Sequence, residues 1–316
     1  MDFLWFLEGI RTPAGNEFFQ FVTCFGQETF LLAVICCFYW CVNKTFACQL
    51  GLTYFSSGLF VQSMKITFRI PRPWVLDPDF PPVKSAVSHA TGYSFPSGHT
   101  QGGTCLFAPL AMKAGNRILK VLFTAAFLLI GFSRMYLGVH TPKDVLAALT
   151  VSLAFSWFFS RFSSRLFDHI RTLCIVLAIC AFAVLLYACL LMHLDRLAVR
   201  YAADCIKAAG AGLGFAAGLY LEQTRLRFST AARTRTAQAI KLLAGLFSTL
   251  LFKLFLSGLG SALLWKAFVY AFLVFWILFL YPALFVFVQK KVIVFSFYCL
   301  CFSDFVSKLI AFNIFF

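Results

Sequence analysis

Residues 172–192 read TLCIVLAICAFAVLLYACLLM and contain no charged side chain. About 20 apolar residues in an α-helix are enough to cross the hydrocarbon core of a bilayer, so this run predicts a transmembrane helix. Similar runs recur on both sides of it and predict eight further spans, at about 19–41, 46–64, 99–113, 118–136, 143–162, 205–221, 240–260 and 265–288.

The composition of the whole chain points the same way. Of its 316 residues, 61% are hydrophobic and 12% are charged. A soluble domain is nearer half apolar and a quarter charged. The 42 phenylalanines are too many for one water-soluble core, so apolar surface must face lipid. We therefore predict an all-α fold, a polytopic transmembrane helical bundle.

The spacing of the spans divides the chain into three regions. A short apolar N-terminal stretch with flanking acids is too short to span and is expected to lie in the membrane interface. A basic linker at 222–241, after the seventh span, is the best internal boundary. The predicted regions are an interfacial segment at 1–18, a membrane core at 19–192 and additional C-terminal membrane helices at 193–316. Residues 292–316 are apolar but interrupted by charges, so their membrane placement stays open.

The formal net charge of +15 comes from basic residues that sit between apolar runs. This placement fits topology signals and anionic lipid headgroups, and no zinc-finger, homeodomain or RNA-recognition pattern accompanies it, so we expect no nucleic-acid partner. The positive-inside rule puts the polar, proline-rich segment 65–98 on the non-cytoplasmic face of a cell membrane. The 12 cysteines lack metal-ligand spacing, and we expect neither a metal nor another cofactor.

Three polar clusters stand at the ends of predicted spans, and the span count places all three at one membrane face. The first contains Lys65 and Arg72, the second is Pro96-Ser97-Gly98-His99, and the third contains Ser133, Arg134, His140 and Asp144. Lys65, Arg72 and Arg134 supply three cations for a phosphate group. Ser97 can cap a helix and leave the first amides of that helix, from Gly98 onward, pointed at an anion.

The two histidines suggest a division of labour. His140 can attack phosphorus if its other ring nitrogen is held by an acceptor, and Asp144, four residues later, can hold it. His99 can give a proton to the leaving oxygen.

Each motif also has a purely structural interpretation. Asp144 can complete a capping box with Thr141 at a helix start, and Lys65 and Arg72 can be interfacial anchors. Ser97-Gly98 can be a simple turn, and His99 can be structural. The chemical interpretation depends on all of these residues meeting at one face.

The spacings Lys65-x6-Arg72-Pro73, Pro96-Ser97-Gly98-His99 and Ser133-Arg134-x5-His140-x3-Asp144 together resemble the three-part signature of the type 2 phosphatidic acid phosphatase superfamily. The resemblance covers roughly residues 19–165 and implies a helical-bundle core with metal-independent hydrolysis. It implies a nucleophile at His140, its partner at Asp144 and a general acid at His99. It further implies phosphate ligands at Lys65, Arg72, Ser97, Gly98 and Arg134, and a supporting role for Ser133.

The chain departs from this family at both ends. Many members have three spans before the first motif, whereas only two are clear here. The signature assigns no catalytic role to the extra spans beyond about residue 200. They could dimerise, form an entry path for a lipid, bind a partner or stabilise the bundle.

These residues are compatible with more than one function. The first hypothesis is a phosphatase of a membrane lipid: an isoprenoid diphosphate, phosphatidic acid or phosphatidylglycerol phosphate. The second is a phosphatase of a small soluble phosphate, or a phosphotransferase. An anion transporter is the third and weakest, because transport needs no histidine–aspartate pair facing a second histidine. The expected partners are the phosphate substrate and membrane lipids, and a homo-oligomer is left open.

Overall fold

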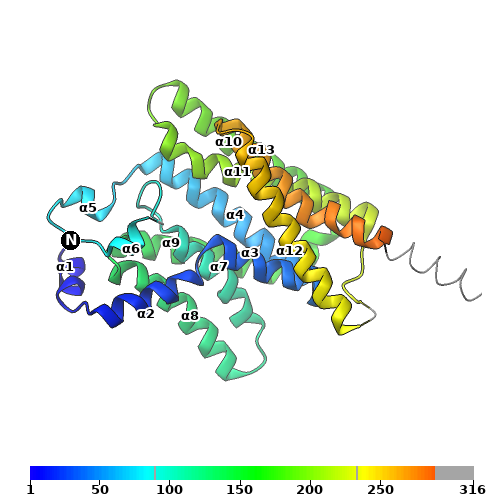
Figure 1. The fold of residues 1–316 in the computed structure, drawn as a ribbon, viewed down its shortest axis with the longest axis horizontal. Coiled ribbons are helices and arrows are strands. Elements are labelled where there is room, and N and C mark those ends of the chain that lie inside the picture. Colours follow the sequence, from blue (N-terminus) through cyan, green and yellow to red (C-terminus); the bar gives the residue numbers. More distant parts are fainter. Residues whose placement is uncertain (89, 233, 289–316) are drawn as a thin grey trace, which may run out of the picture.

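The structure, a computed structural model, describes residues 1–88, 90–232 and 234–288, and within these ranges every regular element is a helix. Figure 1 shows a bundle in which the helices before residue 170 lie on one side and the C-terminal helices on the other. The predicted all-α membrane fold is confirmed. The tail at 292–316 lies outside the described residues.

The helices are α1 (Asp2–Gly9), α2 (Pro13–Cys24), α3 (Glu28–Cys37), α4 (Lys44–Phe68), α5 (Pro73–Leu76), α6 (Lys84–Val87), α7 (Gly98–Lys113), α8 (Arg117–Tyr136), α9 (Pro142–Asp168), α10 (Ile170–His193), α11 (Val199–Leu221), α12 (Arg235–Gly258) and α13 (Leu263–Phe275). Three π-helical turns extend α3, α11 and α13, namely η1 (Phe38–Val42), η2 (Glu222–Leu226) and η3 (Trp276–Leu280).

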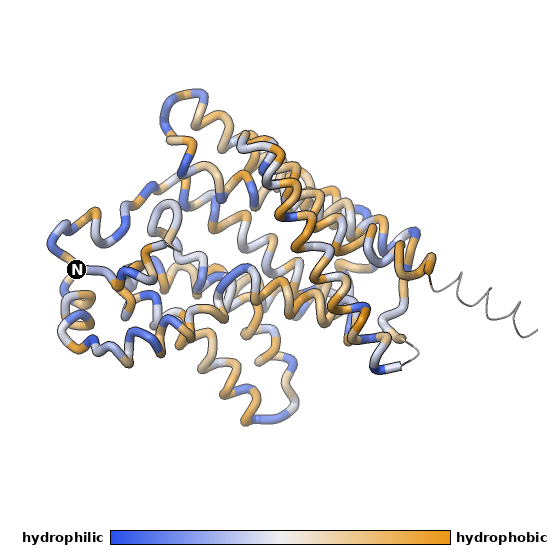
Figure 2. Tube along the Cα trace, in the orientation of Figure 1, coloured by the Kyte–Doolittle hydropathy of each residue, from blue (hydrophilic) through white to orange (hydrophobic). Residues whose placement is uncertain are grey.

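Five helices in the described part are long and apolar enough to cross a membrane: α8, α9, α10, α12 and the segment Leu263–Val288 that begins with α13. Figure 2 shows these helices as mostly hydrophobic, with the polar residues gathered in the connections. They correspond to the predicted spans at 118–136, 143–162, 172–192, 240–260 and 265–288.

The predicted span at 19–41 consists of two helices, α2 and the segment Glu28–Val42, which only together are long and apolar enough to cross a membrane. The chain bends by 44° between α2 and the segment Glu28–Val42. Gly26 lies at the bend, packed against the backbone carbonyl of His99; a Cβ on Gly26 would lie 2.6 Å from that oxygen. The close approach of α7 therefore requires a residue without a side chain at the break, and brings this bend next to a predicted site residue.

Three other predicted spans form helices that do not meet the same criterion. The region 99–113 is α7, which has only 16 residues, and the regions 46–64 and 205–221 are α4 and α11. The physical reason is that α4 and α11 are inner helices. α4 packs against α7, α9, α10 and α11, so its buried face can carry polar side chains that a lipid-facing helix cannot.

The polar segment between α4 and α7 begins later than the sequence suggests. α4 continues through Lys65 to Phe68 and ends at Arg69, which has a left-handed backbone with φ of 51°. Lys65 is thus a residue of the last helical turn, not of the loop. The loop itself contains the short helices α5 and α6.

The C-terminal helices pack tightly on one another, as the glycine-rich sequence of α11 predicts. Gly210 and Gly214 of α11 contact the backbone of α13, where a Cβ would collide with the carbonyls of Ala267 and Ala271. The other side of α11 packs against α10 and α4. α11 therefore joins the C-terminal helices to the core. The division of the chain at residues 18 and 192 stays a prediction.

Candidate active site

The turn between α8 and α9 carries the third polar cluster. Arg134 lies in the last turn of α8, His140 in the connection, and Asp144 in the first turn of α9. The backbone N–H of Thr141 donates to Asp144 Oδ2 at 2.7 Å, as a capping box requires. The same oxygen lies 3.4 Å from Nδ1 of His140. The capping and orienting interpretations, which the sequence presents as alternatives, are both compatible with this geometry.

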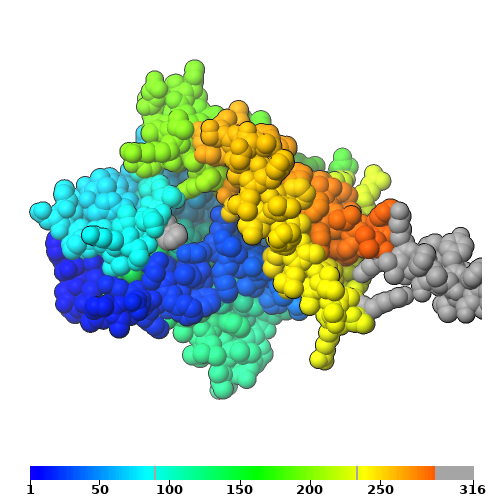
Figure 3. All heavy atoms as spheres, in the orientation of Figure 1, coloured from blue at the N-terminus to red at the C-terminus, as the bar shows by residue number. Residues whose placement is uncertain are grey.

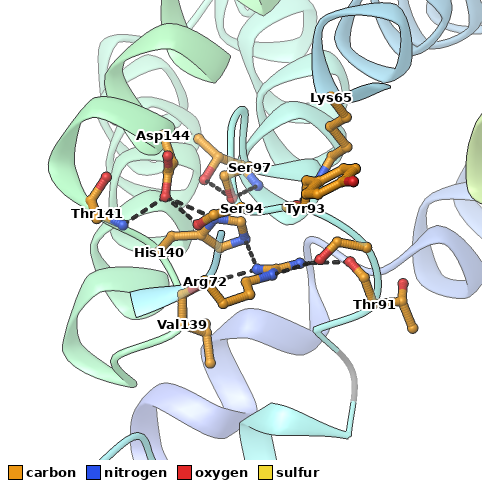
Figure 4. A network of polar contacts seen from close by, with 12 residues as sticks. Lys65, Arg72, Thr91, Tyr93, Ser94, Ser97, Val139, His140, Thr141 and Asp144 are labelled. Atoms are coloured by element: carbon orange, nitrogen blue, oxygen red, sulfur yellow. Dashed lines mark hydrogen bonds and ion pairs between the residues drawn. The ribbon is translucent and has the colours of Figure 1, made fainter. Parts of the chain in front are cut away.

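Ser94, for which the sequence analysis predicts no role, contacts both residues of this pair. Its hydroxyl donates to Asp144 Oδ2 at 2.6 Å and lies 3.4 Å from His140 Nδ1. All three side chains are buried. Figure 4 shows Ser94 and Asp144 on the same side of the His140 ring. The only feature of the sequence that could have indicated this role is the position of Ser94, three residues before Ser97. The contact of Ser94 with Asp144 depends on the path of the loop before α7.

The tautomer of His140 follows from its contact with Arg72. Arg72 Nη1 lies 2.9 Å from His140 Nε2, and a guanidinium can only donate. Nε2 must therefore accept, and the ring proton is on Nδ1, facing Asp144 and Ser94. Burial, with the charges of Arg72, Arg134 and Lys65, lowers the pKa of His140 well below its ordinary value. The ring is thus neutral, with the lone pair of Nε2 directed at the cationic side.

Backbone carbonyls hold the first two cations in place. Arg72 donates to the carbonyls of Thr91, Gly92 and Val139 at 2.6, 3.1 and 3.0 Å. Lys65 Nζ donates to the carbonyl of Tyr93 at 3.0 Å. The carbonyls of Thr91, Gly92 and Tyr93 belong to the loop before α7, whereas that of Val139 belongs to the turn between α8 and α9, beside His140 in Figure 4. Lys65 of α4, Arg72 and the loop at 91–93 are distant in sequence from His140 and lie around it in the structure.

The remaining predicted residues lie around the same space. Arg134 Nη1 donates to Thr23 Oγ1 of α2 at 2.8 Å. Its Nε and Nη2, and Nε2 of His99, are buried without a hydrogen-bond partner in the described part of the chain. Buried polar atoms are normally paired, so these atoms point to a polar ligand.

Ser97 is the N-cap of α7, as predicted, and accepts a hydrogen bond from the N–H of Thr100 at 3.4 Å. Gly98 is the first residue of that helix, and a Cβ on it would meet no atom within 4 Å. The first amides of α7 therefore have room for an anion beside them. Ser133 lies outside this group: its hydroxyl bonds to the carbonyl of Ile130 in its own helix, at 2.6 Å.

A cavity of about 420 Å³ joins these residues. Its lining includes the two cations of α4 and the following loop, the start of α7, Arg134 and both histidines, that is Lys65, Arg72, Gly98, His99, Arg134 and His140. The structure thus brings six residues from the three motifs to one cavity, and their roles stay predictions. Figure 3 shows the surface hollowed where α11, α12 and the N-terminal helices meet.

The loop that holds Arg72 is itself fixed by α11. Thr91 Oγ1 donates to Asp204 Oδ2 at 2.7 Å, while the carbonyl of Thr91 accepts from Arg72. Two residues further on, the rings of Tyr93 and Tyr201 stack with centroids 4.3 Å apart. The sequence signature does not include Asp204 or Tyr201. Both contacts place α11 in direct support of the loop around His140.

The fold and the cationic cavity together describe a membrane protein whose interior can hold a phosphate-like anion. Residues 46–168 match the PAP2 superfamily, and residues 206–291 match the transmembrane extension of PAP2 superfamily phosphatases. Together the two matches cover more than half of the chain, and the chain belongs to the PAP2 superfamily. The first match contains every predicted site residue.

Several curated proteins are similar to the chain. Phosphatidylglycerophosphatase B of Bacillus subtilis is 26% identical over 50% of the chain and 79% of its own length. Undecaprenyl-diphosphatase BcrC of the same organism is 34% identical over 37% of the chain and 57% of its own length. A probable sphingosine-1-phosphate phosphatase of Dictyostelium discoideum is 26% identical over 46% of the chain and 38% of its own length. No solved structure shows a significant match. These relatives indicate a membrane lipid phosphatase.

We expect Asp144→Asn to lower kcat by at least about tenfold without loss of folding. Asparagine can still accept from the N–H of Thr141, but it carries no charge to stabilise the His140 ring once that ring becomes positive. Phosphate release and thermal unfolding of the purified protein in detergent measure the two effects. Full activity in Asp144→Asn would show that the carboxylate only caps α9.

The contact between Thr91 and Asp204 gives a second prediction. We expect Thr91→Val and Asp204→Ala each to lower kcat several-fold, because either change frees the loop that orients Arg72. The double variant should lose no more than the single variants, since both remove the same hydrogen bond. Thr91→Ser keeps the hydroxyl and serves as the matched control. Additive losses in the double variant would contradict this coupling.

Proposed function

We propose that the chain is a metal-independent lipid phosphatase that acts through a covalent phosphohistidine at His140. The observation that carries the proposal is the orientation of the His140 ring. Its Nδ1 proton faces Asp144, and its Nε2 lone pair faces Arg72 beside a cavity that Lys65, Arg134 and His99 also line. This is the arrangement that an in-line attack on a phosphoryl group needs.

The proposed first step forms one bond and breaks one. His140 Nε2 attacks phosphorus, the bond to the leaving oxygen breaks, and His99 gives that oxygen a proton. Burial and the neighbouring cations lower the pKa of His99 well below its ordinary value, and the negative charge of a bound phosphate opposes this shift and favours the protonated ring. Lys65, Arg72 and Arg134 stabilise the charge on the equatorial oxygens. A phosphate oxygen would take over the donor of Arg72 that the histidine accepts in the structure.

The second step returns the enzyme to its starting state. A water molecule attacks phosphorus, the bond to His140 Nε2 breaks, and His99, now neutral, accepts the proton of the water. Asp144 stabilises the positive ring of His140 while the phosphoryl group is attached. Ser94 supports Asp144 in this role through its 2.6 Å hydrogen bond. Each proton given up by His99 is thus recovered within one cycle.

The membrane setting and the named relatives favour a lipid substrate. The candidates are an isoprenoid diphosphate, phosphatidic acid and phosphatidylglycerol phosphate, whose tails can stay in the bilayer while the phosphate enters the cavity. The same residues would serve hydrolysis of a soluble phosphate or transfer to another acceptor. An anion transporter is disfavoured, because passage of an anion has no use for the Ser94–Asp144–His140 contacts.

A phosphate label provides the direct test of the intermediate. With substrate labelled in its terminal phosphate, we expect wild-type protein quenched in alkaline detergent to carry label that is stable to base and lost in acid. His140→Ala should carry none and should release no phosphate. Chelation of divalent metals should change neither result in the wild type. His193→Ala, at the exposed end of α10, is the matched control.

Label that survives in His140→Ala would place the nucleophile elsewhere. Activity that disappears on chelation, and returns with a divalent metal, would overturn metal independence.

We also propose that the site faces the non-cytoplasmic side of the cell membrane, as the distribution of basic residues predicts. A cysteine at the exposed Asp79, in the loop before the site, should react with a membrane-impermeant thiol reagent in intact cells. A cysteine at Gly115, between α7 and α8, should react only after lysis. The parent protein, which carries only the native cysteines, is treated in the same way and gives the background labelling. The reverse pattern would place the site on the cytoplasmic side.

A further inference from the structure

The wall of the cavity opposite the signature residues is built by the C-terminal membrane helices. α11 contributes Asp204 and Lys207, α12 contributes Thr249 and Lys253, and the segment that begins with α13 contributes mainly apolar side chains. At about 420 Å³, the cavity is in the range of sites for whole small ligands, about 300–1,000 Å³. It can therefore hold more of a substrate than the transferred phosphate.

Lys253 is the first unusual residue of this wall. It lies on α12, one of the helices apolar enough to span the membrane, and lines the cavity. No hydrogen bond or ion pair joins it to any residue that the structure describes. Ionisable side chains in membrane helices are rare and usually face functional cavities, because they are costly in lipid. Thr249, one turn earlier, lines the same space.

Glu28 faces the same cavity from the start of α3. Lys207 and Lys253 line the cavity with it, yet Glu28 forms no ion pair with either among the described residues. Lys207 is held by Asp204 at 3.0 Å, and Asp204 is held by Thr91. A free carboxylate and a free ammonium thus share the cavity, supported by one paired lysine.

Lys253 comes from a different part of the bundle than the cations of the phosphate site. Lys65 and Arg134 lie at the ends of α4 and α8, and Arg72 in the loop after α4, whereas α12, which carries Lys253, packs mainly against α13, α3 and η1. An anion bound at Lys253 would therefore belong to a part of the substrate separated from the transferred phosphate by a spacer.

We propose that Lys253 and Glu28, supported by Lys207, bind the headgroup between the transferred phosphate and the lipid tail. The ligand that matches them is a lipid whose terminal phosphate is joined through a hydroxyl-bearing glycerol to a second phosphate. The ammonium pairs with the second phosphate, and the carboxylate accepts from the hydroxyl. A diphosphate places its two phosphates side by side, and phosphatidic acid has no second phosphate. The inference rests on the proposed lipid phosphatase activity.

Steady-state kinetics on matched lipids tests this inference. Wild type, Lys253→Met and Glu28→Gln are compared on phosphatidylglycerol phosphate, phosphatidic acid and an isoprenoid diphosphate in the same detergent micelles. We expect both variants to raise KM for phosphatidylglycerol phosphate by about tenfold, the effect of one charged hydrogen bond, with kcat unchanged. KM for the other two lipids should stay within twofold.

Two control variants separate binding from folding. Lys253→Arg keeps the positive charge and should stay close to wild type, and Lys266→Met, on α13 outside the cavity, should change nothing. Thermal unfolding of each variant in detergent shows whether it is folded.

Each other result overturns the inference in a recognisable way. An equal change of KM for all three lipids, or none, would make Lys253 and Glu28 structural. A change only for the diphosphate would place the second phosphate next to the first. An effect of Glu28→Gln alone would indicate a headgroup amine in place of a phosphate. If wild type releases phosphate from none of the lipids, it is the proposed function that fails.

Discussion

The contact between Arg72 and His140 is the point on which the structure around the cavity depends. Arg72 Nη1 lies 2.9 Å from His140 Nε2, and the rest of the guanidinium is held by three backbone carbonyls. Two of those carbonyls belong to the loop before α7, and the third precedes His140 itself. One planar side chain thus fixes the spacing between the loop and the α8–α9 turn. A lysine, with a single mobile ammonium, could not make this set of directed bonds.

Local sequence patterns were sufficient for the parts of the site that depend on neighbouring residues. The cap at Ser97 and the capping box of Thr141 and Asp144 can be read from a few consecutive residues, because a helix start needs acceptors within one turn. The meeting of the three motifs at one cavity followed from their positions at the ends of spans. The predicted supporting role of Ser133 stays a prediction, since its hydroxyl contacts only its own helix.

What the sequence could not supply depends on tertiary contacts. The bend between α2 and α3 lies where Gly26 contacts the backbone of His99. No sequence pattern near residue 26 predicts that α7 packs so closely there. α4 and α11 are too polar to pass as spans because their partners are other helices. Ser94 and Asp204 reach the site only through the path of the loop at 91–94. In each case the deciding neighbour is far away in the sequence.

The position of α11 changes how the C-terminal extension should be understood. A helix that only stabilised the bundle would need apolar and small residues, and α11 has these where Gly210 and Gly214 pack on α13. Its N-terminal half carries Tyr201, Asp204 and Lys207, which contact the loop or line the cavity. The half-buried Asp204 accepts a hydrogen bond from Thr91 and forms an ion pair with Lys207. Two contacts join α11 to the loop around Arg72: the hydrogen bond between Thr91 and Asp204 and the stacking of Tyr93 on Tyr201. The C-terminal extension therefore helps to position the residues around His140.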